Sequence, residues 1–162
     1  MKTVRILGCI ATLALVAAPA IHAQGTATQT VTFQVDAINQ ISVAGTPSLL
    51  INAAAAGSAP TSVTASGGTW AVTTNQTGAK ITASIASAMP TGLTLSANLG
   101  APSGATSAGL KPLGTTAVDL VTGITKLNAT GLSLNYQLDA TAAAGVVTSA
   151  TRVVTFTITG GV

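Results

Sequence analysis

The sequence predicts an all-β protein, an antiparallel immunoglobulin-like β-sandwich of about seven to eight strands. Thr, Ala, Val, Gly and Ser dominate residues 24–162, where Thr and Val favour strands and Gly and Ser favour turns. Apolar residues recur at every second position along much of this part of the chain, which is typical of half-buried strands. Turn-rich stretches separate these alternating stretches, as an antiparallel sandwich requires.

The clearest alternation lies in residues 30–37, where apolar side chains face one way and polar side chains the other. The apolar side chains of this predicted strand are Val31, Phe33, Val35 and Ala37. After a bulge at Asn39-Gln40, further alternation predicts strands at 41–43, 49–53, 68–75, 81–85, 93–99, 132–138 and 154–158. The core expected from this pattern contains Val31, Phe33, Val35, Trp70, Ile81, Leu95, Leu134, Tyr136, Phe156 and Ile158.

Three turn-rich stretches connect the predicted strands, at residues 53–60, 100–112 and 140–150. The first and the last are rich in Ala, so each has room for a short helical turn. In a β-sandwich the loops gather at the two ends of the sheets, where they are free to contact other molecules. The stretches at 100–112 and 140–150 are therefore the main candidate recognition loops of the domain.

The N-terminus has the features of a bacterial signal peptide, which we predict over residues 1–23. Two positive charges precede an apolar run over residues 6–18, and small residues follow it. This run is shorter than the roughly 20 residues that a membrane-spanning helix needs, and we expect no transmembrane segment in the mature chain. Cleavage is predicted after Ala23, with Ala20 as the alternative. The mature chain would then be a single domain, residues 24–162, that is secreted, periplasmic or at the cell surface.

The composition of residues 24–162 argues against the common kinds of catalysis by side chains. Because this stretch contains no Cys, His or Glu, it lacks a thiol nucleophile, a Ser-His-Asp triad and the ligands of an ordinary zinc site. Its charged residues are Asp36, Lys80, Lys111, Asp119, Lys126, Asp139 and Arg152. They are too scattered to predict a glycosidase carboxylate pair or a basic patch for nucleic acid. A Ser-Lys or Tyr-Lys pair is the route to catalysis that stays open, but we predict no enzyme, no cofactor and no metal.

Four residues have a functional and a structural interpretation. Trp70 and Tyr136 could stack on sugar rings, but both lie in alternating stretches, so we expect core residues with one polar group each. Asp119 and Asp139 could bind calcium, but no Asp-x-Asp spacing or Asp/Asn/Gly loop surrounds them. We therefore expect these two carboxylates to be solvated or to cap turns.

At the level of family, the chain resembles small exported β-sandwich proteins of the bacterial fimbrial and spore-coat-U-like subunit type. The resemblance rests on an exported, Thr- and Ala-rich chain, on the N-terminal alternating stretch at 30–35 and on the closing stretch at 152–159. It covers most of the mature chain as a pattern. It implies an immunoglobulin-like sandwich and a structural role at the cell surface.

Two classes of function follow. The first is a structural subunit of a filament, coat or matrix, whose partners are copies of itself or related surface subunits. Only 6 % of the residues are charged, against roughly 25 % in ordinary domains, so little repulsion keeps molecules apart. Residues 28–38 would supply the pairing strand through Val31, Phe33, Val35 and Ala37, or would instead complete their own sandwich. The second class is a monomeric module that recognises a glycan or a protein through the loops at 100–112 and 140–150.

Overall fold

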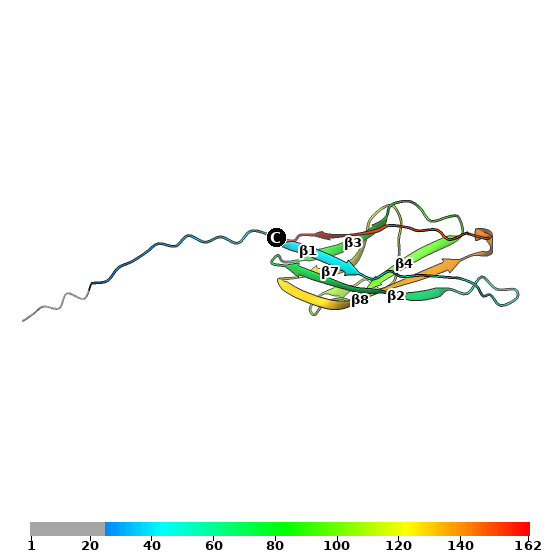
Figure 1. Ribbon diagram of the computed structural model, residues 1–162, viewed down its shortest axis with the longest axis horizontal. Coiled ribbons are helices and arrows are strands. Elements are labelled where there is room, and N and C mark those ends of the chain that lie inside the picture. The colour runs from blue at the N-terminus through cyan, green and yellow to red at the C-terminus, as the bar shows by residue number, and fades with distance from the viewer. Residues whose placement is uncertain (1–24) are drawn as a thin grey trace, which may run out of the picture. The chain divides into compact units, whose positions relative to one another are not determined.

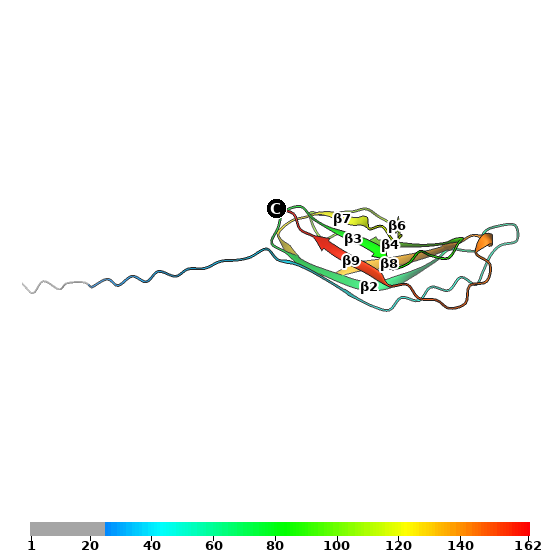
Figure 2. The same ribbon diagram turned by 90° about the horizontal axis from the view of Figure 1, so that it is seen from above.

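The computed structural model describes residues 25–162, so the predicted signal peptide and both predicted cleavage sites lie outside the described residues. Residues 25–34 belong to one unit, and residues 35–162 form another. The second unit contains two antiparallel β-sheets, which confirms the predicted β-sandwich (Figure 1). Figure 2 shows the two layers, with β3 and β7 on one side and β2 on the other.

The strands of the larger sheet follow one another in the order β1-β2-β8-β4-β6. Their bounds are Asn39–Ala44 for β1, Val63–Thr74 for β2, Leu127–Ala140 for β8, Leu93–Leu99 for β4 and Lys111–Pro112 for β6. The smaller sheet has the order β5-β7-β3-β9. Its strands are Thr106–Ser107 for β5, Val118–Ile124 for β7, Ala79–Ile85 for β3 and Val154–Thr159 for β9. A single 3-10 turn, Ala142–Ala144, lies in the last Ala-rich stretch, as its composition allowed.

The core lies between the two sheets and is built by the predicted alternation. In β3, every second side chain is buried, and the residues between them are partly exposed. The largest fully buried side chains are Trp70, Ile81, Leu99, Leu120, Val121 and Ile124. Trp70 donates a hydrogen bond from Nε1 to the carbonyl oxygen of Gly100 over 3.1 Å, so it is a core residue with its polar group satisfied, as expected.

The predicted core is correct inside the sheets and wrong at the N-terminal segment. Of the residues expected inside, the structure buries Trp70, Ile81, Leu95, Leu134 and Tyr136, and it buries Phe156 and Ile158 in part. Val31, Phe33 and Val35 are instead 71 %, 89 % and 77 % exposed. Residues 30–37 form no strand, and neither sheet of the described residues includes them.

Two other expectations about strands need correction, and one strand was not predicted. Asn39 and Gln40 form no bulge but begin β1, in register with Thr74 and Thr73 of β2. Residues 49–53 form no strand. The sequence also gave no sign of β7, in which the neighbours Leu120 and Val121 are both buried and interrupt the alternation. A shift in the register between β3 and β7 at Val121 lets both side chains enter the core.

Candidate functional site

β1 is an edge strand of the larger sheet, and β9 is an edge strand of the smaller sheet. The order β1-β2-β8-β4 corresponds to strands A-B-E-D of an immunoglobulin-type sandwich, and β3 and β9 correspond to strands C and F. In that fold a further strand, G, covers the outer edge of strand F. Among residues 25–162 no strand pairs with the outer edge of β9. The N–H and C=O groups of that edge are therefore available for pairing with another strand.

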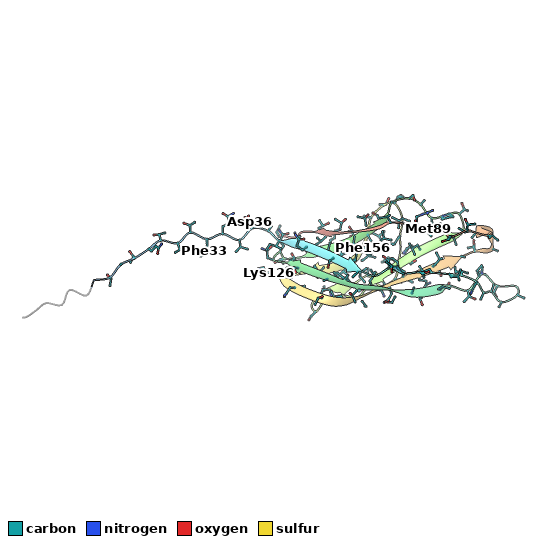
Figure 3. The ribbon with its side chains drawn as sticks, viewed as in Figure 1. Phe33, Asp36, Met89, Lys126 and Phe156 are labelled. Atoms are coloured by element: carbon teal, nitrogen blue, oxygen red, sulfur yellow. The ribbon has the colours of Figure 1, made fainter. Side chains whose placement is uncertain are left out.

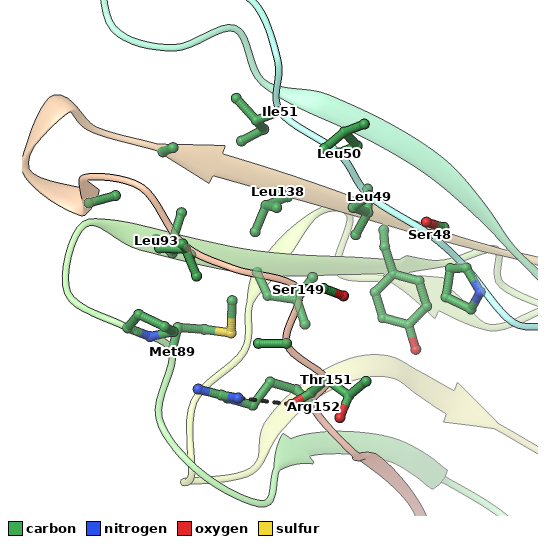
Figure 4. Close-up of a pocket in the computed structure, with 18 of the residues that line it drawn as sticks. Ser48, Leu49, Leu50, Ile51, Met89, Leu93, Leu138, Ser149, Thr151 and Arg152 are labelled. Atoms are coloured by element: carbon green, nitrogen blue, oxygen red, sulfur yellow. Dashed lines mark hydrogen bonds between the residues drawn. The ribbon is translucent and has the colours of Figure 1, made fainter.

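A groove of about 1070 Å³ opens beside this edge (Figure 4). It begins at Val43 and Ala44, the last residues of β1, and at Val154 and Phe156 in the first half of β9. Its floor consists of side chains from β4 and β8, namely Leu93, Leu95, Leu134, Tyr136 and Leu138. The groove is thus a gap in the hydrophobic core that neither sheet closes.

One wall of the groove is the chain that follows β1, residues 45–54, and Gly45 explains why β1 stops there. The φ angle of Gly45 is 125°, and a Cβ at this position would lie 2.3 Å from the carbonyl oxygen of Gly67. Only glycine fits this conformation and this close approach of two backbones. Beyond it, Pro47 has no N–H to offer a neighbouring strand, so the chain leaves the sheet and Leu49 turns into the groove (Figure 4).

The other wall is the chain that precedes β9, residues 144–152. Arg152 ends this wall. Its guanidinium donates a hydrogen bond to the carbonyl oxygen of Thr151 over 2.8 Å (Figure 4) and another to the carbonyl oxygen of Ala88 over 3.2 Å. Arg152 is the one charged residue among those that line the described groove. The groove is therefore apolar along its floor and positive at the end where β9 begins.

Tyr136 supplies the polar group of the groove floor. The side chain is only 6 % exposed, and burial raises the pKa of its phenol above the ordinary value of 10.0. The phenol is therefore neutral at any physiological pH. Tyr136 and Arg152 thus give a groove with a largely apolar floor one neutral and one positively charged polar group.

The predicted pairing residues lie on an exposed, extended stretch (Figure 3). Val31, Phe33, Val35 and Ala37 are all exposed, and residues 25–38 form no secondary structure. Just before β1, the side chain of Asn75 binds the backbone on both sides of Ala37. It accepts a hydrogen bond from the Ile38 N–H over 2.8 Å and donates one to the Asp36 carbonyl oxygen over 2.7 Å. Asn75 thus holds residues 36–38 at the start of β1.

The carboxylates that could have suggested calcium have protein partners instead. Asp119 forms an ion pair with Lys80 at 3.0 Å, with both side chains about half exposed. Asp139 accepts a hydrogen bond from Ser62 Oγ and two from Gln137 Nε2, at 2.9 and 3.1 Å. The part of the chain that the structure covers contains no group of three or more His, Cys, Asp or Glu side chains placed to hold a metal ion.

Within residues 25–162, no helix is both long enough and apolar enough to cross a membrane. The groove at the β9 edge was not predicted from the sequence, because it arises where two strands distant in the chain reach the same side of the sandwich. The one sequence signal that relates to it is the alternation at residues 30–37, which fits a strand but is not part of a sheet within residues 25–162. No family model, no curated protein and no solved structure matches this chain.

Proposed function

We propose that this protein is an exported, non-enzymatic structural subunit that assembles with copies of itself or with related surface subunits. Its N-terminal segment, residues 28–38, is the part that pairs with a neighbour by adding a strand to an open sheet edge. The observation that carries the proposal is the exposure of Val31, Phe33 and Val35 on one face of an alternating stretch.

Exposed apolar side chains in such a row are unusual on a monomeric protein. Burying each one in an interface would contribute about 1.5–3 kcal/mol, so a partner that covers the row gains a substantial driving force. Because few residues of the chain are charged, electrostatic repulsion between copies is weak. The signal-peptide pattern of residues 1–23 supports export, and the residue types of the mature chain support a role without catalysis.

The test compares two substitutions in the same segment of the mature chain. Phe33→Asp places a charge in the apolar row, whereas Thr32→Asp places the same charge on the opposite face of the strand. We expect light scattering to detect assemblies of the wild type and of Thr32→Asp but only monomers of Phe33→Asp. If the wild type stays monomeric at high concentration, self-assembly is wrong.

The second candidate is a monomeric binding module, and the groove is the observation that favours it. Residues 144–150, which belong to a predicted recognition loop, form part of the groove wall. A monomeric wild type that binds an added peptide or glycan, and loses this binding when Leu93 is replaced by Asp, would make this candidate the better account. Gly100–Pro112, the other predicted loop, does not reach the groove.

A further inference from the structure

We infer that the groove binds a fatty acid, with the carboxylate at Arg152 and the acyl chain along the leucine side chains of the floor. This inference goes beyond the proposed self-assembly and does not depend on it. It rests on three properties of the groove, namely its size, the distribution of apolar and charged groups in it, and the irregular course of its walls.

The volume of the groove suits one small amphiphilic molecule. At about 1070 Å³ it is close to the upper end of the roughly 300–1,000 Å³ that is typical of small-molecule sites. Such sites are mostly apolar and have a few polar groups that fix how the ligand lies. A single acyl chain with one polar headgroup fits this description.

An apolar path crosses the groove. Leu93 and Leu95 of β4 and Leu138 of β8 form part of its floor. In Figure 4, Leu93 and Leu138 lie between Ile51 on one side and Arg152 on the other. Methylene groups that pack on these side chains are removed from water, which is the driving force for binding an acyl chain.

Arg152 places one positive charge at the end of this path. Its Nε and one N–H of Nη1 donate to the carbonyl oxygens of Ala88 and Thr151, which fixes the guanidinium. Both N–H groups of Nη2 have no partner among residues 25–162, so they are available to a carboxylate. The other residues that line the described groove are uncharged, and the phenol of Tyr136 stays protonated at neutral pH. No side chain of this lining therefore repels an anion.

The walls favour an acyl chain over a peptide. A bound peptide strand needs a regular series of N–H and C=O groups with which to pair. Neither wall, residues 45–54 or residues 144–152, forms a strand, so only the first half of β9 offers such a series along the groove. An acyl chain has no backbone polar groups and needs no such partners. A glycan would meet leucine side chains on the floor, where its hydroxyl groups need hydrogen-bond partners.

Isothermal titration calorimetry with dodecanoate tests the site. The mature protein is kept dilute, and dodecanoate stays below the concentration at which it forms micelles. We expect one dodecanoate per chain. Decanoate should bind about tenfold more weakly, because two fewer CH₂ groups are removed from water. The inference is wrong if dodecanoate shows no saturable binding or if the two fatty acids bind equally well.

A substitution of Arg152 tests the position of the carboxylate. Arg152→Gln removes the positive charge and keeps a side-chain N–H donor, so it should weaken the binding of dodecanoate about fivefold. The binding of 1-decanol, which has no charge, should not change. Lys111→Gln removes the same charge from β6, outside the groove lining, and should bind dodecanoate as the wild type does. If Arg152→Gln binds both ligands like the wild type, the carboxylate does not lie at Arg152 and the inference fails.

A substitution in the floor tests the position of the acyl chain. Leu93→Gln places a polar group on the floor and should weaken the binding of dodecanoate and of 1-decanol about tenfold. The thermal unfolding midpoint of the variant shows whether it is folded. If it is not, Leu49→Gln takes its place, because Leu49 lies in a wall outside both sheets. Unchanged binding in a folded variant would overturn the site.

Two other modes of binding give different results. Another exposed apolar surface is the row of Val31, Phe33 and Val35. Phe33→Asp should bind dodecanoate as the wild type does, and a loss of binding would place the ligand on this row and overturn the groove site. A wild type that binds phosphatidylglycerol vesicles but not dodecanoate would have a membrane surface as its ligand, which would also overturn the inference. Light scattering measures self-assembly separately, so the inference and the proposed function fail independently.

Discussion

The ring of Tyr136 on β8 lies directly over the α-carbon of Gly67 on β2. A Cβ on Gly67 would be 2.6 Å from Cε2 and 2.7 Å from Cδ2 of that ring, and 2.8 Å from Cγ of Leu134. These two side chains form part of the groove floor. The missing side chain of Gly67 therefore sets the depth at which the floor of the groove lies.

Gly67→Ala should consequently destabilise the domain. The new methyl group displaces a buried ring and a buried Leu, and overpacking of this kind costs about 1–3 kcal/mol. Chemical denaturation followed by Trp70 fluorescence measures the change. Gly114→Ala is the matched control, because a Cβ there would meet no atom nearer than 4.0 Å. Equal stability of the two variants would mean that Tyr136 does not pack against Gly67.

The second prediction separates the true core from the exposed row. Trp70→Ala should cost about 3–5 kcal/mol, because it empties a fully buried site and leaves the Gly100 carbonyl without its donor. Phe33→Ala should leave the unfolding midpoint of dilute, monomeric protein within about one degree of the wild type. Thermal unfolding at low protein concentration checks both. A large loss for Phe33→Ala under these conditions would show that residues 30–37 pack inside their own domain.

Phe33 also shows what local sequence pattern can and cannot establish. Alternation correctly located β3, β4, β8 and β9. One face of each of these strands packs against the opposite sheet, and the other face is turned toward solvent. The same pattern in residues 30–37 indicates that a stretch is suited to a half-buried strand. The pattern does not tell which other stretch covers the apolar face of residues 30–37. The prediction that Phe33 is buried in its own chain was therefore wrong.

The groove lay beyond prediction for a related reason. It depends on Gly45 turning the chain away from β2 and on the position of β9 at the edge of its sheet, and both are long-range relationships. The missed strand β7 illustrates a smaller effect, since Leu120 and Val121 are both buried at a change of register. A search for apolar residues at every second position fails wherever a bulge brings two adjacent side chains to the same face of the sheet.

The third prediction concerns the ion pair between Lys80 and Asp119. Because the two side chains are 43 % and 48 % exposed, solvent and salt screen their attraction, and the pair should contribute less than about 1 kcal/mol. Asp119→Asn should therefore reduce the free energy of unfolding only slightly, and 1 M salt should reduce this difference further. A loss of more than about 2 kcal/mol would indicate that Asp119 has a role beyond this surface pair.

The last prediction concerns alkaline pH and the phenol of Tyr136. Burial raises its pKa in the folded protein above the 10.0 expected for an unfolded chain, so folding favours the protonated phenol. This contribution to stability is fully present below pH 10, declines as the unfolded phenol begins to ionise, and is lost as the pH rises through the folded pKa. Tyr136→Phe has no such group, so its free energy of unfolding should fall less between pH 9 and 11 than that of the wild type.

Urea denaturation at a series of pH values measures how the free energy of unfolding of each protein changes with pH. The absorbance of tyrosinate at 295 nm gives the folded pKa directly, since Tyr136 is the one tyrosine of the sequence. Identical slopes, or a phenol that titrates near 10 in the folded protein, would show that the floor of the groove is open to water.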